Sequence, residues 1–138
     1  MIRWLALALA VACVAFAATT WLALEWSGVA VVETQAADGS ARQTHVWTVE
    51  REGFTWLEAG KPENPWFADA SRDPHIRLRV DGRTVDALAE VVPEASPAVR
   101  AAMRAKYGWR DAWVQMLVNA NRATAVRVRA RSPAERGP

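Results

Sequence analysis

The beginning of the chain is one continuous apolar run. No charged residue occurs from Trp4 to Leu24, and at a helical rise of about 1.5 Å per residue this run matches the roughly 30 Å hydrocarbon core of a bilayer. We therefore predict a single membrane-spanning helix and assign residues 1–27 to an anchor. A cleavable signal peptide is the alternative, with Arg3 as its positive region. Arg3 before the run and Glu25 after it favour a cytoplasmic amino terminus.

Beyond the anchor, apolar and polar residues alternate over short segments, as they do in half-buried strands. Turn-forming residues separate the segments, for example Ala37-Asp38-Gly39-Ser40 and Asp81-Gly82. Because each strand buries only one face, the pattern indicates an antiparallel sheet and excludes a parallel dinucleotide-binding architecture. The predicted strands are Val29–Gln35, Thr44–Val49, Phe54–Glu58, His75–Val80, a segment from Asp81-Gly82 to Pro93, and Thr124–Ala130.

Two hairpins predict a register. Across a tight loop at residues 51–53, Trp47 is expected to face Trp56 and Val49 to face Phe54. These pairs would stack aromatic rings on one face of the sheet, either as structural core or as a cofactor wall. Counting outward from Asp81-Gly82 pairs Leu78 with Val85, Ile76 with Ala87, and Arg77 with Asp86.

Two helices are predicted between the last two strands. The first begins at Ser96-Pro97 and ends at Tyr107, before Gly108. The second begins at Trp109, and we expect its apolar side to pack against the sheet. That side carries Trp109, Trp113, Met116, Leu117 and Ala120.

The pattern as a whole predicts an α+β fold that combines the membrane helix with a small antiparallel barrel or sandwich. The folded part is assigned to residues 28–130, and residues 131–138, with two prolines and a glycine, to a disordered tail. The chain has 138 residues, of which 51% are hydrophobic, so about 100 residues remain for one small domain once the anchor is set aside.

Charge and cysteine content exclude several classes of protein. The net charge is +2, and the arginines are spread through alternating positions, so no nucleic-acid partner is predicted. The single cysteine, Cys13, lies in the apolar run, which leaves no disulfide or thiol chemistry in the folded part. His45 and His75 lie on separate predicted strands without a completing ligand set, so no metal site is predicted.

The bend at Gly60-Lys61 is the strongest candidate binding feature. It immediately precedes a predicted helix, Pro65–Arg72, with Asn64 as N-cap and Pro65 at the first helical position. The amides of the first turn would then point toward the bend, and amides beside a lysine attract anions such as phosphate. The alternative is a polar connecting loop whose lysine faces water.

The order of these motifs resembles a known family. The run Gly60-Lys61-Pro62-Glu63-Asn64-Pro65-Trp66-Phe67, followed by Asp73-Pro74-His75-Ile76-Arg77-Leu78 and Asp81-Gly82-Arg83, is similar to the deazaflavin-dependent nitroreductase family of split β-barrels, which are related to flavin reductases. Lys106-Tyr107-Gly108-Trp109 is similar to the segment after that family's penultimate strand. The resemblance covers residues from about Val29 to Arg129.

This resemblance implies a six-stranded split β-barrel with two or three helices, and hydride transfer from a reduced deazaflavin coenzyme, or FMN, to a quinone-like or nitroaromatic acceptor. It also implies membrane association and, as in related split barrels, a homodimer. Lys61, beside the Asn64 helix start, would contact the anionic tail of the cofactor. The remaining implied positions are Thr44, His45, Trp47, Trp66 and Phe67 around the ring, and Tyr107 and Trp109 on the acceptor side.

The hairpin between the first two strands departs from that family. The family has a basic Gly-Arg-Lys-Ser/Thr-Gly segment there, whereas this chain has the acidic Asp38 and only Arg42 as a cation. FMN, haem, a quinone or no cofactor therefore remain open. The two resulting hypotheses are a membrane-anchored oxidoreductase and a non-catalytic, membrane-tethered split barrel that binds haem, a lipid or a protein.

Overall fold

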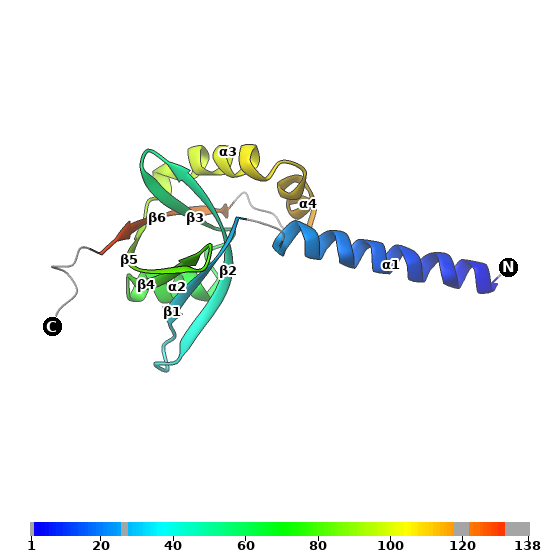
Figure 1. The fold of residues 1–138 in the computed structure, drawn as a ribbon, viewed down its shortest axis with the longest axis horizontal. Coiled ribbons are helices and arrows are strands. Elements are labelled where there is room, and N and C mark those ends of the chain that lie inside the picture. Colours follow the sequence, from blue (N-terminus) through cyan, green and yellow to red (C-terminus); the bar gives the residue numbers. More distant parts are fainter. Residues whose placement is uncertain (1, 26–27, 118–121, 132–138) are drawn as a thin grey trace.

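In a computed structural model, a long helix leads into a small β-barrel (Figure 1). The structure describes residues 2–25, 28–117 and 122–131. The predicted tail at 132–138 and Ala120 of the last predicted helix lie outside the described residues. The elements are α1 (Ile2–Glu25), β1 (Val29–Gln35), β2 (Ala41–Arg51), β3 (Phe54–Ala59), α2 (Pro65–Arg72), β4 (His75–Val80), β5 (Arg83–Val91), the short 3-10 turn η1 (Pro93–Ala95), α3 (Ser96–Tyr107), α4 (Trp109–Leu117) and β6 (Thr124–Ala130).

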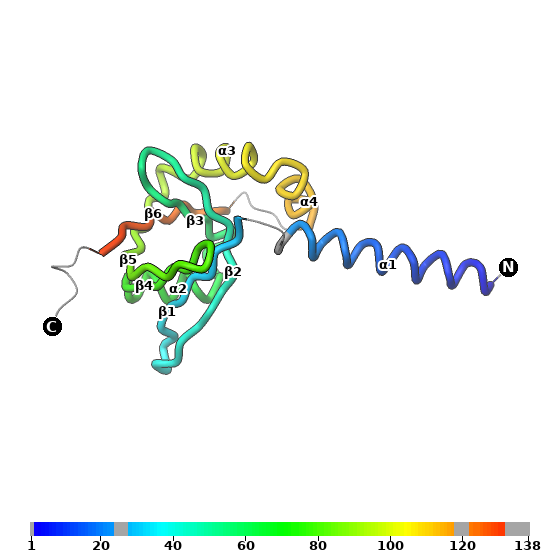
Figure 2. The backbone as a smooth tube through the Cα atoms, in the orientation of Figure 1, coloured from blue at the N-terminus to red at the C-terminus, as the bar shows by residue number. Residues whose placement is uncertain are grey.

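The six strands form a closed antiparallel barrel. Their order around the barrel is β1-β2-β3-β6-β5-β4, and β4 pairs with β1 to complete the ring. Figure 2 shows the strands arranged around an open centre, with α1, α3 and α4 clear of it. The predicted six-stranded antiparallel α+β fold is therefore confirmed.

The two predicted hairpins have different outcomes. The β4–β5 register is confirmed, with Leu78 opposite Val85, Ile76 opposite Ala87 and Arg77 opposite Asp86. The predicted β2–β3 register is wrong by two residues, because Val49 faces Trp56 and Arg51 faces Phe54. The physical reason is a two-residue turn in which Glu52 and Gly53 both have positive φ, 56° and 78°, the conformation of tight β-hairpins. Trp47 lies opposite Val29 of β1 instead.

The barrel interior holds the main core. α2 contributes Trp66 and Ala70 to it, so this helix closes the interior from one side. Burial of this apolar set away from water is the main stabilising contribution to the fold. The buried members are Ala30, Val32, Val46, Leu57, Ala59, Trp66, Ala70, Ile76, Leu78, Ala87, Ala89, Val126 and Val128.

α3 covers the outer face of β2, β3 and β6 and forms a second buried cluster. Val99, Met103 and Tyr107 follow one another at four-residue spacing along α3, and all three are buried. They pack against Val49 and Trp56 of the sheet. α3 therefore buries one apolar side against the sheet.

α4 does not pack as the sequence pattern indicated. It lies against α1 and α3, beside the barrel-proximal end of α1 (Figure 1). Trp113 contacts α1, while Trp109, Met116 and Leu117 are exposed. The expectation that this apolar side packs on the sheet is therefore wrong. The physical reason is that the opposite side of α4 carries Asp111, which is buried in an ion pair with α3.

α1 projects away from the barrel as a single straight rod (Figure 1). Its segment Ile2–Ala23 has a mean hydropathy of 2.2 and is long and apolar enough to cross a membrane, a test that a signal sequence also passes. Among the described residues, it is the one helix that meets this criterion.

Candidate functional site

A cavity lies where strands β2 and β3 part. Their pairing runs only from Arg51 opposite Phe54 to Thr48 opposite Leu57. Beyond that point β3 pairs with β6, and β2 pairs with β1. The gap forms a cavity of about 380 Å³, which we call the split cavity. Its lining comprises Val29, Thr44, His45, Val46, Trp47, Glu58, Gly60, Asn64, Pro65, Trp66, Arg100, Val114 and Gln115.

Five of the residues singled out from the sequence meet in this cavity. Thr44, His45 and Trp47 come from β2, while Asn64 and Trp66 come from the start of α2. These positions are far apart in the chain, and the closure of the barrel brings them together. Aromatic and aliphatic walls with a few polar groups are typical of sites for small molecules.

The Gly60-Lys61 bend is only partly built into the cavity. Gly60 lines it, whereas Lys61 is exposed and lies outside the lining. Asn64 occupies the N-cap position of α2 and Pro65 the first position, as predicted, but the Asn64 side chain makes no capping hydrogen bond. Two of the first-turn amides that were expected to face an anion, those of Phe67 and Ala68, donate to the Asn64 carbonyl, and the Asn64 N–H donates to the Lys61 carbonyl.

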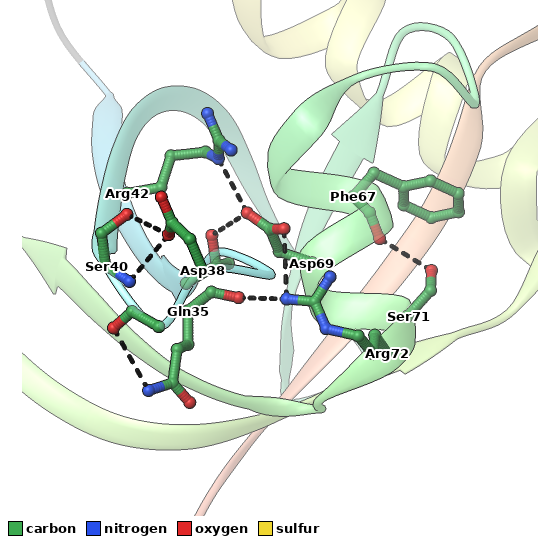
Figure 3. Close-up of polar contacts among 10 residues, drawn as sticks. Gln35, Asp38, Ser40, Arg42, Phe67, Asp69, Ser71 and Arg72 are labelled. Atoms are coloured by element: carbon green, nitrogen blue, oxygen red, sulfur yellow. Dashed lines mark hydrogen bonds and ion pairs between the residues drawn. The ribbon is translucent and has the colours of Figure 1, made fainter.

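Arg42, the predicted cation of the β1–β2 hairpin, forms an ion pair with the carboxylate of Asp69. Its Nε donates to Asp69 Oδ2 at 2.7 Å. Asp69 is buried and also accepts from the Thr34 hydroxyl at 3.2 Å and lies 3.4 Å from Arg72 Nη2. Figure 3 shows Asp69 at the centre of these contacts, between the hairpin and α2. The hydrogen bond from Arg42 is the main reason that the pKa of Asp69 is lowered.

The other three predicted site residues lie outside the cavity lining. Phe67 packs against the barrel interior, with its ring 6.0 Å from that of Trp66. Tyr107, the last residue of α3, is buried, and its ring stacks on that of Trp47 with 4.4 Å between the centroids. Trp109, at the start of α4, is exposed. Among these three, Tyr107 contacts a wall residue of the cavity directly.

A buried ion cluster, which the sequence did not reveal, forms one edge of the split cavity. The guanidinium of Arg100 on α3 contacts Glu58 of β3 and Asp111 of α4. The side chains of Arg100, Glu58 and Asp111 are 16%, 11% and 2% exposed, so one cation serves two carboxylates away from water. The sequence did contain one indication, an acidic residue between Leu57 and Ala59 in an otherwise apolar strand.

Burial raises the pKa of Glu58. Loss of hydration disfavours the ionised carboxylate and raises the pKa of Glu58, and the adjacent Arg100 only partly opposes this effect. Because Glu58 also lines the split cavity, it offers a carboxyl group that can hold a proton beside a bound molecule. Carboxyl groups of this kind are common at functional sites.

A second cavity of about 760 Å³ lies at the hairpin end of the barrel. It is bordered by Gly53 and Phe54 of the β2–β3 hairpin and by Asp81 and Arg83 of the β4–β5 hairpin. None of the ten predicted cofactor- or acceptor-site residues lines it, and its floor consists of interior side chains such as Leu78. The split cavity, which combines predicted residues with a buried ion cluster, is therefore the candidate site.

A six-stranded antiparallel barrel with this order of elements belongs to a known fold. No protein-family model matches the sequence, and no curated protein matches it significantly. Solved structures do match, and these matches establish the fold and confirm the suspected likeness to split barrels at that level.

Three of the similar structures are proteins of different kinds. A conserved hypothetical protein of Mycobacterium tuberculosis is 23% identical, with a TM-score of 0.60 over 84% of this chain and 80% of its own. The haem storage protein HutZ of Vibrio cholerae is 14% identical, with a TM-score of 0.58 over 80% of this chain and 86% of its own. An F420 reductase is 13% identical, with a TM-score of 0.56 over 80% of this chain and 93% of its own.

Proposed function

We propose that the protein is a membrane-anchored oxidoreductase that binds a flavin-type ring, deazaflavin or FMN, in the split cavity and passes hydride to a quinone-like or nitroaromatic acceptor. The convergence of Thr44, His45, Trp47, Asn64 and Trp66 on that one cavity carries the proposal. The similar fold of an F420 reductase supports the class of cofactor. The apolar α1, long enough to span a bilayer, supports the anchor.

The cavity suits a planar ring better than a charged tail. Trp47 and Trp66 provide flat apolar walls, and a volume of about 380 Å³ lies at the lower end of the roughly 300–1,000 Å³ usual for small-molecule sites. Arg42 is engaged by Asp69, and Lys61 lies outside the lining. The ring would therefore lie inside, with the phosphate-bearing tail directed toward Lys61 and solvent.

When bound, the reduced ring supplies the hydride, and the protein supplies position and environment. The aromatic walls exclude water from the ring. Glu58, whose pKa is raised by burial, is placed to hold a proton at the cavity wall. Arg100 on α3 keeps that carboxyl in position through its ion pair with Glu58.

The test is a titration of the full-length protein in detergent with the deazaflavin coenzyme and with FMN. The quenching of tryptophan fluorescence measures binding. His45→Ala removes a cavity side chain and should weaken binding about tenfold or more, the effect of losing about 1.4 kcal/mol of contact. His75→Ala is the matched control, because His75 is exposed on β4 and pairs with Asp73 outside the cavity. The oxidoreductase proposal fails if neither cofactor binds the wild-type protein.

A second candidate function is haem binding without catalysis. Two observations favour it: His45, a potential iron ligand, lines the cavity, and the haem storage protein HutZ has a similar fold. Haem titration would then give a sharp Soret band that His45→Ala removes and His75→Ala retains. Mass spectrometry of any small molecule that copurifies distinguishes this function from the first.

A further inference from the structure

One side of α4 faces the split cavity and α3. Asp111 on this side is buried against Arg100, and Val114 and Gln115 line the split cavity. At 100° per residue these three positions fall on one side of the helix. α4 is therefore a wall of the candidate site.

The opposite side of α4 is entirely apolar. Trp109, Trp113, Met116 and Leu117 lie on it at i, i+4, i+7 and i+8. Within the described part of the chain, Trp113 contacts α1 through Phe16 and Thr20. Trp109, Met116 and Leu117 are 59%, 75% and 48% exposed. Large apolar side chains that gather on one exposed helix face mark a site of contact with another molecule or with a membrane.

The position of Trp113 along α1 indicates that partner. Its ring lies 5.5 Å from that of Phe16, and its indole N–H donates to the Thr20 hydroxyl at 3.1 Å. The apolar span of α1 ends at Ala23, so Phe16 and Thr20 lie roughly 5–10 Å below that end at helical rise. This is also the depth of about 5–10 Å at which amphipathic helices lie in a membrane interface.

Two basic side chains lie near the junction between α1 and the barrel, and one of them, Lys106, donates from Nζ to the Thr48 carbonyl at 2.7 Å. Lys106 Nζ is 5.2 Å and the Arg110 guanidinium 5.0 Å from the centroid of the Tyr107 ring. The Tyr107 hydroxyl contacts the carbonyl of Gly28, where the chain leaves α1 for the barrel. Cations just above an apolar helix face attract lipid phosphates.

On the basis of the anchoring proposed above, we propose that α4 is an in-plane membrane helix. Its face of Trp109, Trp113, Met116 and Leu117 lies in the leaflet beside α1, and the partner is the lipid bilayer itself. A second copy of the chain is a poorer partner, since a nine-residue helix offers far less than the ~800 Å² that each side of a stable interface usually buries. The split cavity then lies directly above the lipid surface, so a lipophilic, ring-sized acceptor reaches it from the membrane plane.

The test uses the full-length protein in lipid nanodiscs with an environment-sensitive fluorophore on a single cysteine. Cys13 is the one native cysteine and is exposed on α1, so its label reports the anchor. In a Cys13→Ser background, Met116→Cys places the label on α4. Ala37→Cys is the matched control, because it is exposed at the tip of the β1–β2 hairpin, about 23 Å of strand away from the end of α1.

Nitroxide groups attached to lipid acyl chains near the headgroups then quench labels that lie in the leaflet. We expect the Met116 label to lose at least half of its emission, the Cys13 label to be quenched best by deeper nitroxides, and the Ala37 label to be unaffected. Quenching at Cys13 without quenching at Met116 overturns the proposal and leaves the anchor intact. No quenching at either position overturns both. A Met116 label that is shielded from aqueous iodide but not quenched by lipid nitroxides means that protein covers α4, which also overturns it.

Discussion

The hydroxyl oxygen of Tyr107 lies 2.6 Å from the carbonyl oxygen of Gly28. This contact joins the end of α3 to the point where the chain enters the barrel. The same hydroxyl accepts a hydrogen bond from the Thr48 N–H at 3.0 Å. The Thr48 carbonyl receives the Lys106 ammonium at 2.7 Å, so the single hydroxyl proton is best used on Gly28. The Tyr107 side chain therefore connects α3, β2 and the segment between α1 and β1.

Tyr107→Phe tests this junction. The ring still stacks on Trp47, but the Thr48 amide and the Gly28 carbonyl lose their partner. We expect the free energy of unfolding to fall by about 1–3 kcal/mol, the cost of leaving buried polar groups unpaired. Urea unfolding of the detergent-solubilised protein measures the change. Equal stability of variant and wild type would show that water replaces the hydroxyl at no cost.

Gly28→Ala should destabilise the protein more than Gly53→Ala. Both glycines have positive φ, 70° and 78°, a conformation that costs an alanine about 1–2 kcal/mol. A Cβ at Gly28 would also lie 3.1 Å from the Tyr107 hydroxyl, whereas a Cβ at Gly53 would meet nothing within 4 Å. The difference between the two thermal midpoints isolates the crowding at the junction, and equal midpoints would contradict it.

Asp69→Asn should loosen the β1–β2 hairpin from α2. The change weakens the contacts that Arg42 and Arg72 make with a buried carboxylate, and we expect a loss of about 1–3 kcal/mol in the free energy of unfolding. Asp86→Asn is the control, because Asp86 pairs with Arg77 at the surface, at 3.7 Å, and such pairs contribute about 0–1 kcal/mol. A loss for Asp86→Asn as large as that for Asp69→Asn would contradict the special role of Asp69.

The same carboxylate predicts an acid transition. The folded-state pKa of Asp69 is lowered, chiefly by the Arg42 hydrogen bond, so its stabilisation is present above the unfolded pKa of about 3.9 and is lost as pH falls through the folded value. Acid unfolding of wild type should therefore include a component below pH ~4 that Asp69→Asn lacks. Identical stability curves for the two proteins between pH ~5 and ~2 would exclude this contribution.

Glu58 and Asp111 should respond oppositely to neutralisation, although both contact Arg100. Burial raises the pKa of Glu58, so its stabilising contribution is fully present below the unfolded pKa of about 4.3 and is lost as pH rises through the folded value. Glu58→Gln should thus leave stability at pH ~8 unchanged or higher. Asp111→Asn deprives Arg100 of its more deeply buried partner and should cost about 3–5 kcal/mol.

Stability curves of both variants from pH ~4 to ~9 measure this contrast. The decline of wild-type stability with rising pH should be smaller in Glu58→Gln, since the titrating carboxyl is gone. A Glu58→Gln variant that is strongly destabilised at pH ~8 would mean that the ion pair with Arg100 outweighs the cost of burial.

Local sequence signals located most elements correctly. The predicted bounds of β1, α2, β4 and β6 agree with the structure, because turn residues, prolines and strict alternation mark where these elements begin and end. The β4–β5 register followed from Asp81-Gly82. The β2–β3 register did not, since the sequence did not show whether two or three residues form the turn at Glu52-Gly53.

The sequence did not show which element the apolar side of α4 packs against. The apolar side of α4 was correctly recognised, but it was assigned to the sheet when in the structure it lies against α1 and outward. Periodicity identifies an apolar side without naming what covers it, and another apolar helix of the same chain is an equally suitable partner. The deciding contact, Asp111 with Arg100, joins two helices through charged residues that a hydrophobic pattern places in solvent.

The sequence by itself determined the apolar first helix, the six strands and most of their bounds, because these depend on composition and on spacing between near neighbours. Only the tertiary structure decided that β2 and β3 part to form a cavity, that Arg42 is engaged by Asp69, and that Glu58, Arg100 and Asp111 meet in one buried cluster. Those features depend on how the barrel closes and where the helices dock. Closure brings together residues up to tens of positions apart whose local patterns carry no information about one another.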